Sequence, residues 1–113
     1  MNAYELALAA VDDPSALNYI PEPDFRDHVL AQAANGNHTI KANMSRRSGD
    51  TVTVWMWTAQ PSMQYLSDQS IAWLARNEVS DGEHVHRIRS NSYRGNTAVG
   101  GEVLEHIYRV DRA

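Results

Sequence analysis

Apolar and polar residues alternate with a period of two most clearly between residues 38 and 58. Residues 51–58 read Thr-Val-Thr-Val-Trp-Met-Trp-Thr, and residues 38–44 alternate in the same way before a polar loop that contains Gly49. Two alternating runs joined by such a loop predict a β-hairpin. We expect the loop near residues 45–50.

The two faces of the predicted hairpin differ in character, because successive side chains of a strand point to opposite sides. Val52, Val54 and Met56 form an apolar face, which we expect to pack against helices. Trp55 and Trp57 point the other way, among threonines. In the first run, the residues that we expect to continue the apolar face are Ile40, Ala42 and Met44.

Helical spacing and capping residues place the other elements. Asn2 and Asp24 are predicted N-caps, and Pro14 and Gly36 mark helix ends. Residues 103–110 fit a strand or a short helix, and their β-branched residues favour a strand. We expect a helix from Asn2 that stops before Pro14, a short turn from Asp13-Pro14 through Leu17 to Ile20, and a second main helix from Asp24 that Asn35-Gly36 ends. A third main helix would run from Ser62 or Ser67 to Asn77, with strands over 83–93 and 103–110 and a loop over 91–101. The third main helix has a predicted apolar stripe of Leu66, Trp73 and Leu74, with Ile71 toward one edge.

The order of these elements predicts an α+β domain. We expect N-terminal helices followed by an antiparallel sheet in the order ββαββ, with the helices packed on one face. Residues 1–113 would form a single domain, with an acidic helical part at 1–36 and a sheet part at 37–113.

Composition agrees with one globular domain. The chain has 113 residues, of which 42% are hydrophobic and 21% charged, and it contains no cysteine. No apolar run approaches the roughly 20 residues of a membrane span. The first residues also lack the basic and apolar regions of a signal peptide. We therefore expect a cytoplasmic protein without disulfides.

Charge is unevenly distributed within a formal net charge of −4. Residues 1–36 contain six acidic residues and one arginine, whereas residues 37–113 contain nine basic and eight acidic residues. An acidic surface commonly keeps a protein soluble. The alternatives are that it faces a basic partner or imitates nucleic acid.

The tryptophan face is the first candidate site. Exposed tryptophan is typical of protein interfaces, and aromatic residues beside basic ones can also stack bases and track phosphates. Coverage of the tryptophans by the C-terminal segment or by a second copy is the alternative. The partner-binding residues that this pattern predicts are Trp55, Trp57, Lys41, Arg46, Arg47, Arg87, Arg89, Tyr93 and Arg94.

The histidines are the second candidate. His84 and His86 share a side of a predicted strand, but a metal site needs a third ligand. Candidates for that ligand are His106, Glu105, Asp81 and Glu83. We expect no metal and no cofactor. A ribonuclease-like site would instead need an acid, a base and cations for the phosphate. These would come from His84, His86, His106, Glu102, Glu105, Arg87, Arg89 and Arg94.

The sequence favours a small non-catalytic binding or regulatory protein. We expect it to act by contact with another protein or with a second copy of itself, and an inhibitor of a host system encoded by a phage or mobile element would suit this size. The alternative is a nucleic-acid-binding protein or a small ribonuclease-like enzyme that uses the sheet face bearing histidine and arginine.

Overall fold

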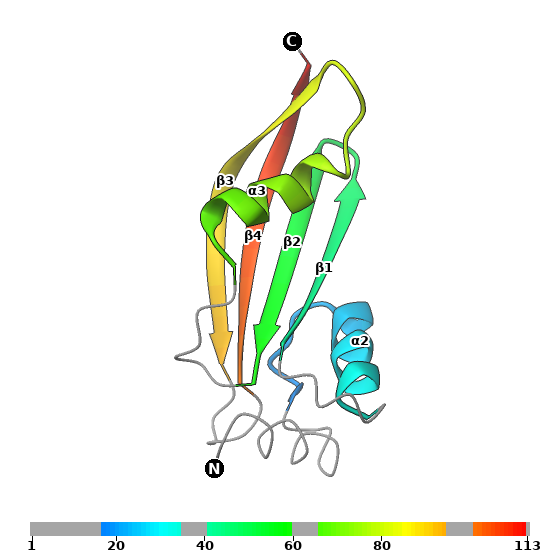
Figure 1. Ribbon diagram of the computed structural model, residues 1–113, viewed down its shortest axis with the longest axis vertical. Helices are drawn as coiled ribbons and strands as arrows, with labels where there is room; N and C mark the ends of the chain where they lie inside the picture. Colours follow the sequence, from blue (N-terminus) through cyan, green and yellow to red (C-terminus); the bar gives the residue numbers. More distant parts are fainter. Residues whose placement is uncertain (1–16, 35–40, 60–65, 95–100, 113) are drawn as a thin grey trace.

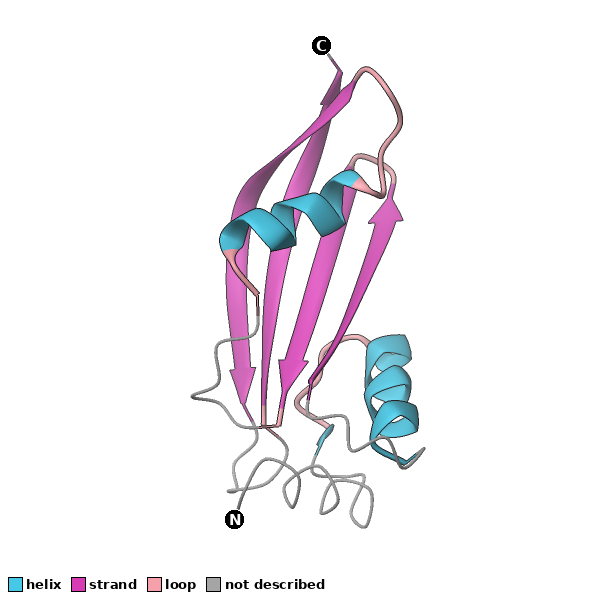
Figure 2. Ribbon diagram, in the orientation of Figure 1, coloured by secondary structure: helices cyan, strands magenta, loops and turns pink. Residues whose placement is uncertain are grey.

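The protein is an antiparallel sheet with helices packed on it (Figures 1 and 2). The computed structural model describes residues 17–34, 41–59, 66–94 and 101–112. The predicted α+β class and antiparallel sheet are confirmed. The helix predicted between Asn2 and Pro14 lies outside the described residues, as does Ile40. None of the described helices is long and apolar enough to cross a membrane.

The elements follow one another as a helix, a hairpin, a second helix and two more strands. They are α2 (Pro23–Ala34), β1 (Lys41–Ser48), β2 (Thr51–Thr58), α3 (Asp68–Arg76), β3 (Glu83–Arg94) and β4 (Glu102–Arg112). The sheet order is β1-β2-β4-β3, with every neighbouring pair antiparallel. The two strands in the middle are therefore β2 and β4, and the two edge strands are β1 and β3. The segment 103–110 is a strand, as its β-branched residues predict, and β3 continues to Arg94 where a loop was expected.

The hairpin turn is tighter than the loop expected at 45–50. Ser48 pairs with Thr51, so only Gly49 and Asp50 lie between the strands. Gly49 has a φ of 61°. Two-residue hairpin loops need such left-handed backbone, which glycine adopts without steric cost.

The helices cover opposite faces of the sheet, so the expectation that they share one face is wrong. Val52, Val54 and Met56 of β2 lie in a core with Ile71 and Ala75 of α3. On the other face, Trp55 and Trp57 lie in a second core with residues that precede or belong to α2: Leu17, Ile20, Phe25 and Val29. Central strand β2 is apolar on both sides, and each side requires its own cover.

The register of the hairpin differs from the expected one. Ala42 is the partner of Trp57, and Met44 is the partner of Trp55. Residues directly opposite on antiparallel strands share a face, so Ala42 and Met44 belong to the tryptophan side and not to the side of Val52. In this register even-numbered residues of β1 lie opposite odd-numbered residues of β2, and a change of one residue would exchange the two faces.

The starts of the helices follow capping rules. The Ser67 hydroxyl accepts a hydrogen bond of 3.1 Å from the Ser70 amide at the start of α3. Helix α2 begins at Pro23, a favoured first position, and the Glu22 carboxylate accepts a hydrogen bond from the Asp24 amide. The predicted cap at Asp24 is thus displaced to Glu22.

Gly101 fixes the place where β4 begins. Its φ is 69°, and a Cβ atom built there would lie 1.8 Å from the Thr58 carbonyl oxygen. Only glycine permits this approach, so the end of β2 and the start of β4 can meet without a side chain between them.

Candidate functional site

Trp55 and Trp57 are buried, and the prediction that they form an exposed binding surface is wrong. Their exposed fractions are 6% and 1%. The ring of Phe25 stacks on Trp55 at a centroid distance of 6.3 Å, and the Trp57 indole donates a hydrogen bond of 3.0 Å to the Tyr19 hydroxyl. The cover comes from the segment that precedes and includes α2, and not from the C-terminal segment. These indoles therefore serve the core.

A buried carboxylate organises the same face. Glu105 accepts hydrogen bonds from the Trp55 indole at 2.7 Å, the Asn91 amide at 3.0 Å and the Tyr93 hydroxyl at 3.1 Å. Burial and the charge of Glu105 raise the pKa of Tyr93, so the phenol stays protonated as a donor. Tyr93, one of the predicted binding residues, is therefore engaged inside the fold. The network ties β2, β3 and β4 together. The only sequence signal for it is an acidic residue within the alternating apolar run at 103–110.

Most arginines of the predicted site are neutralised within the chain. Arg46 contacts Glu22 at 3.1 Å and Asp24 at 2.6 Å, and its guanidinium lies 5.9 Å from the Trp55 ring centre. The other pairs are Arg47 with Glu83, Arg87 with Asp68 and Arg94 with Glu102. These ion pairs would compete with phosphates for the same guanidinium groups.

A β-bulge separates the two arginines in the middle of β3. The register with β4 shifts between Arg87 and Arg89, so that Arg87 pairs with Tyr108 on the α3 side and Arg89 pairs with Ile107 on the tryptophan side. The bulged residue between them, Ile88, is 55% exposed. Lys41 pairs with Thr58, and it too lies on the α3 side. The predicted surface is consequently divided between the two faces of the sheet.

The histidines are divided in the same way. His84 and His86 pair with Asp111 and Arg109 on the tryptophan side, whereas His106 lies on the α3 side. The ring nitrogen Nδ1 of His86 lies 2.6 Å from the Asp111 carboxylate. Over the described ranges, no group of three or more His, Asp or Glu residues is placed to hold a metal ion. The predicted acid, base and cations do not converge on one point.

His106 is buried beside the start of α3. Its Nδ1 lies 2.8 Å from the Ser90 hydroxyl and 3.3 Å from the Arg87 guanidinium. A guanidinium can only donate, so Nδ1 is the unprotonated nitrogen. Burial, followed by the charge of Arg87, lowers the pKa of His106. The ring is thus held neutral as a structural acceptor.

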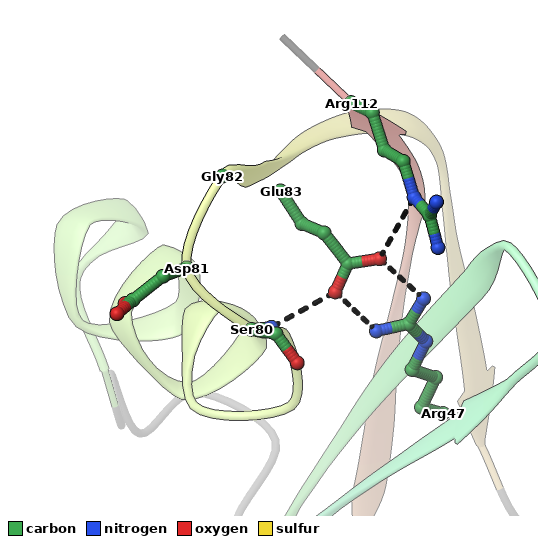
Figure 3. A pocket seen from close by; sticks show the side chains of 6 residues that line it. All are labelled: Arg47, Ser80, Asp81, Gly82, Glu83 and Arg112. Atoms are coloured by element: carbon green, nitrogen blue, oxygen red, sulfur yellow. Dashed lines mark hydrogen bonds and ion pairs between the residues drawn. The ribbon is translucent and has the colours of Figure 1, made fainter.

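A polar hollow lies where the start of β3 meets the hairpin turn and the end of β4 (Figure 3). It measures about 490 Å³, and Glu83 lies between two arginines on its wall. Both terminal nitrogens of the Arg47 guanidinium, Nη1 and Nη2, donate to the Glu83 carboxylate at 2.7 and 2.8 Å, and the Ser80 amide donates to it at 2.9 Å. The more distant Arg112 lies 3.8 Å away. These donors, Arg47 first, lower the pKa of Glu83 to about 2. The Glu83 carboxylate therefore already pairs with the arginines that line the hollow.

The outer face of α3 carries the largest exposed aromatic side chain of the described residues. Trp73 is 58% exposed. Ile71 and Ala75 face the sheet, and Leu66 and Leu74 of the predicted stripe pack against the same core. The prediction that Trp73 belongs to this stripe is wrong. Four residues line a shallow hollow of about 250 Å³ around the indole, and we refer to them as the α3 patch: Gln69, Ser70, Trp73 and Arg76.

Comparison of the chain with protein-family models, curated proteins and solved structures found no match. Function is therefore argued from the geometry of these sites.

Proposed function

We propose that this protein is a non-catalytic binding protein that acts by contact with another protein through the α3 patch. The observation that carries the proposal is the exposure of Trp73. An indole that is more than half exposed on a helix has much apolar area to bury and few rotamers to lose, which makes tryptophan the usual anchor of protein interfaces.

The composition of the α3 patch supports this role. Arg76 lies one turn beyond Trp73, and its side chain has no hydrogen bond or ion pair within the described part of the chain. Arginine is, with tryptophan, among the residues that contribute most to interface energies. Gln69 and Ser70 provide a polar rim. The proposed contact is therefore centred on Trp73, which the sequence assigned to a buried stripe, and not on Trp55 and Trp57.

The alternative functions have less support. Binding of single-stranded nucleic acid needs exposed aromatic platforms and unpaired cations, whereas Trp55 and Trp57 are buried and four of the predicted arginines are paired. A ribonuclease-like reaction needs an acid and a base on either side of one phosphate, and the histidines lie on opposite sheet faces.

Capture of partners from an extract of the producing cell tests the proposal. The protein is immobilised as wild type, as Trp73→Ala and as Ile88→Ala, and the retained proteins are identified by mass. Ile88 is a matched control because it is apolar and 55% exposed but lies on β3. We expect a defined partner that the wild type and Ile88→Ala retain and that Trp73→Ala loses.

Direct titration of the identified partner completes the test. Trp73→Ala should weaken binding by about 2 kcal/mol or more, as central aromatic anchors do, while the melting temperature stays unchanged. If Trp73→Ala binds every captured protein as the wild type does, the α3 patch is not the contact surface. If the partner is a host protein whose activity falls when it is bound, the inhibitor role expected from the sequence is supported.

A further inference from the structure

The outer edge of β3 is the longest unpaired stretch of backbone in the described chain. β3 has 12 residues and pairs with β4 on one side, and on the other side no described strand accompanies it. Alternate residues of an edge strand direct their N–H and C=O groups away from the sheet, where they can pair with an added strand. We propose that residues Arg89–Arg94 of this edge, the β3 edge, bind an extended acidic segment of a partner protein as a fifth strand.

The bulge decides which part of β3 can pair with an added strand. The shift at Ile88 interrupts the alternation, whereas residues 89 to 94 pair without a break with Ile107 to Glu102. Six regular residues match the usual length of a strand. The bulge also blocks the extension of an added strand along the whole edge, which limits uncontrolled association.

Charge selects an acidic occupant. Of the arginines of β3, Arg87 is paired with Asp68 and Arg94 with Glu102, which leaves Arg89. The single acid of the strand, Glu83, is engaged by Arg47. Arg89 is exposed, and it has no hydrogen bond or ion pair within the residues that the structure describes. The chain itself neutralises the opposite edge in this manner, since Arg46 of β1 binds Glu22 and Asp24.

The same charges disfavour a second copy as occupant. A second copy paired through residues 89–94 would bring two further arginines and no acidic residue to this edge, so it would offer Arg89 no opposite charge. A homodimer through this edge is therefore an outcome that would contradict the proposal.

The two faces of the β3 edge define the partner segment further. Arg89, Asn91 and Tyr93 lie on the tryptophan side, where an acidic side chain of the added strand would reach Arg89. On the other side, the small side chains of Ser90 and Ser92 leave Leu104 of β4 38% exposed. A long apolar side chain of the added strand can lean over Ser92 onto Leu104. The structure thus favours a segment in which acidic and apolar residues alternate.

The test uses the full chain and a labelled peptide of about six alternating Glu and Leu residues, the length of an average strand. Two further peptides are controls: one has Lys in place of Glu, and one carries N-methyl groups on alternate backbone amides and cannot extend a sheet. Binding is measured by fluorescence anisotropy, and the contact is located by the amide NMR shifts of residues 89–94.

We expect the wild type to bind the acidic peptide, with the shifts centred on the β3 edge, and to bind neither control. Arg89→Glu should bind the acidic peptide more than about tenfold more weakly than the wild type and should bind the lysine peptide more tightly. Because Arg89 is unpaired within the described chain, the melting temperature of the Arg89→Glu variant should equal that of the wild type. Arg26→Glu on α2 is a matched charge reversal away from β3 and should bind as the wild type does.

Several results would overturn the proposal. They are equal binding of the N-methylated peptide, equal binding of the lysine peptide, absence of shifts at residues 89–94, self-association that Arg89→Glu abolishes, and binding of a single-stranded RNA oligonucleotide in place of the peptide. Trp73→Ala should leave peptide binding unchanged, so failure at the β3 edge and failure at the α3 patch are separately visible.

Discussion

Truncation of Trp57 tests whether the tryptophan face is core, as the structure places it, or a binding surface, as the alternation in the sequence suggests. Trp57→Ala removes a side chain that is 1% exposed and lies among Leu17, Phe25 and Val103. Trp73→Ala makes the same chemical change at a side chain that is 58% exposed. Comparison of the two variants separates the loss of stability that comes from burial from the loss that comes from removing an indole.

The expected magnitudes differ by several kcal/mol. Loss of a fully buried tryptophan removes its transfer free energy and leaves a cavity, which together cost about 3–5 kcal/mol. A surface change away from such features stays within about 0.5 kcal/mol. With a urea dependence of about 2 kcal/mol per molar, a loss of about 4 kcal/mol lowers the unfolding midpoint by about 2 M. This is a large part of the roughly 5–15 kcal/mol by which domains are stable.

The assay is equilibrium unfolding in urea followed by far-UV circular dichroism, because tryptophan fluorescence changes with the substitution itself. If Trp57→Ala is too unstable to measure, Val29→Ala tests the same packing from α2. That change removes two buried methyl groups and should cost at least about 1.6 kcal/mol. Unchanged midpoints for Trp57→Ala and Val29→Ala would refute the burial of this face, and a midpoint for Trp73→Ala as low as that of Trp57→Ala would refute the exposure of α3.

Four further predictions concern buried residues and stability in acid. Glu105→Leu should destabilise the fold by several kcal/mol, because it leaves three donors without their acceptor, each costing about 1–3 kcal/mol. Glu105→Gln should cost less, because one side-chain oxygen can still accept, and equal unfolding midpoints for the two variants would contradict the network. Val54→Asp should also lose several kcal/mol by burying an unpaired charge, and thermal melting that barely changes would show that Val54 is not core. The pKa of Glu83 is lowered from 4.5 to about 2, so its contribution to folding stability is present above pH 4.5 and is lost as the pH falls toward 2; in Glu83→Gln the melting temperature should depend less on pH in that window. The pKa of His106 is lowered from 6.5, so the folding stability should fall as the pH drops below 6.5, and His106→Asn should remove this loss.

The sequence determined the local elements well, because these depend on neighbouring residues. Alternation and β-branched residues predicted β1, β2, β3 and β4, and Asp24 and Ser67 marked the regions where α2 and α3 begin. Patterns of period 2 and 3.6 report the side of an element that is buried, which is enough to predict the α+β class. The expectation that Val52, Val54 and Met56 face a helix is also confirmed, since they pack on α3.

Only the tertiary structure decided what covers each face and which polar groups meet. Trp55 and Trp57 can be read as exposed or buried from alternation alone, because the pattern does not say whether a distant segment such as residues 17–30 returns to cover them. The bulge at Ile88 moved Arg89 to the opposite face from Arg87, and a period-two pattern has no signal for one extra residue. The carboxylates of Glu22, Glu83 and Glu105 find their partners across long separations in sequence. A one-dimensional pattern encodes which face a side chain takes, whereas the choice of partner depends on how the elements pack together.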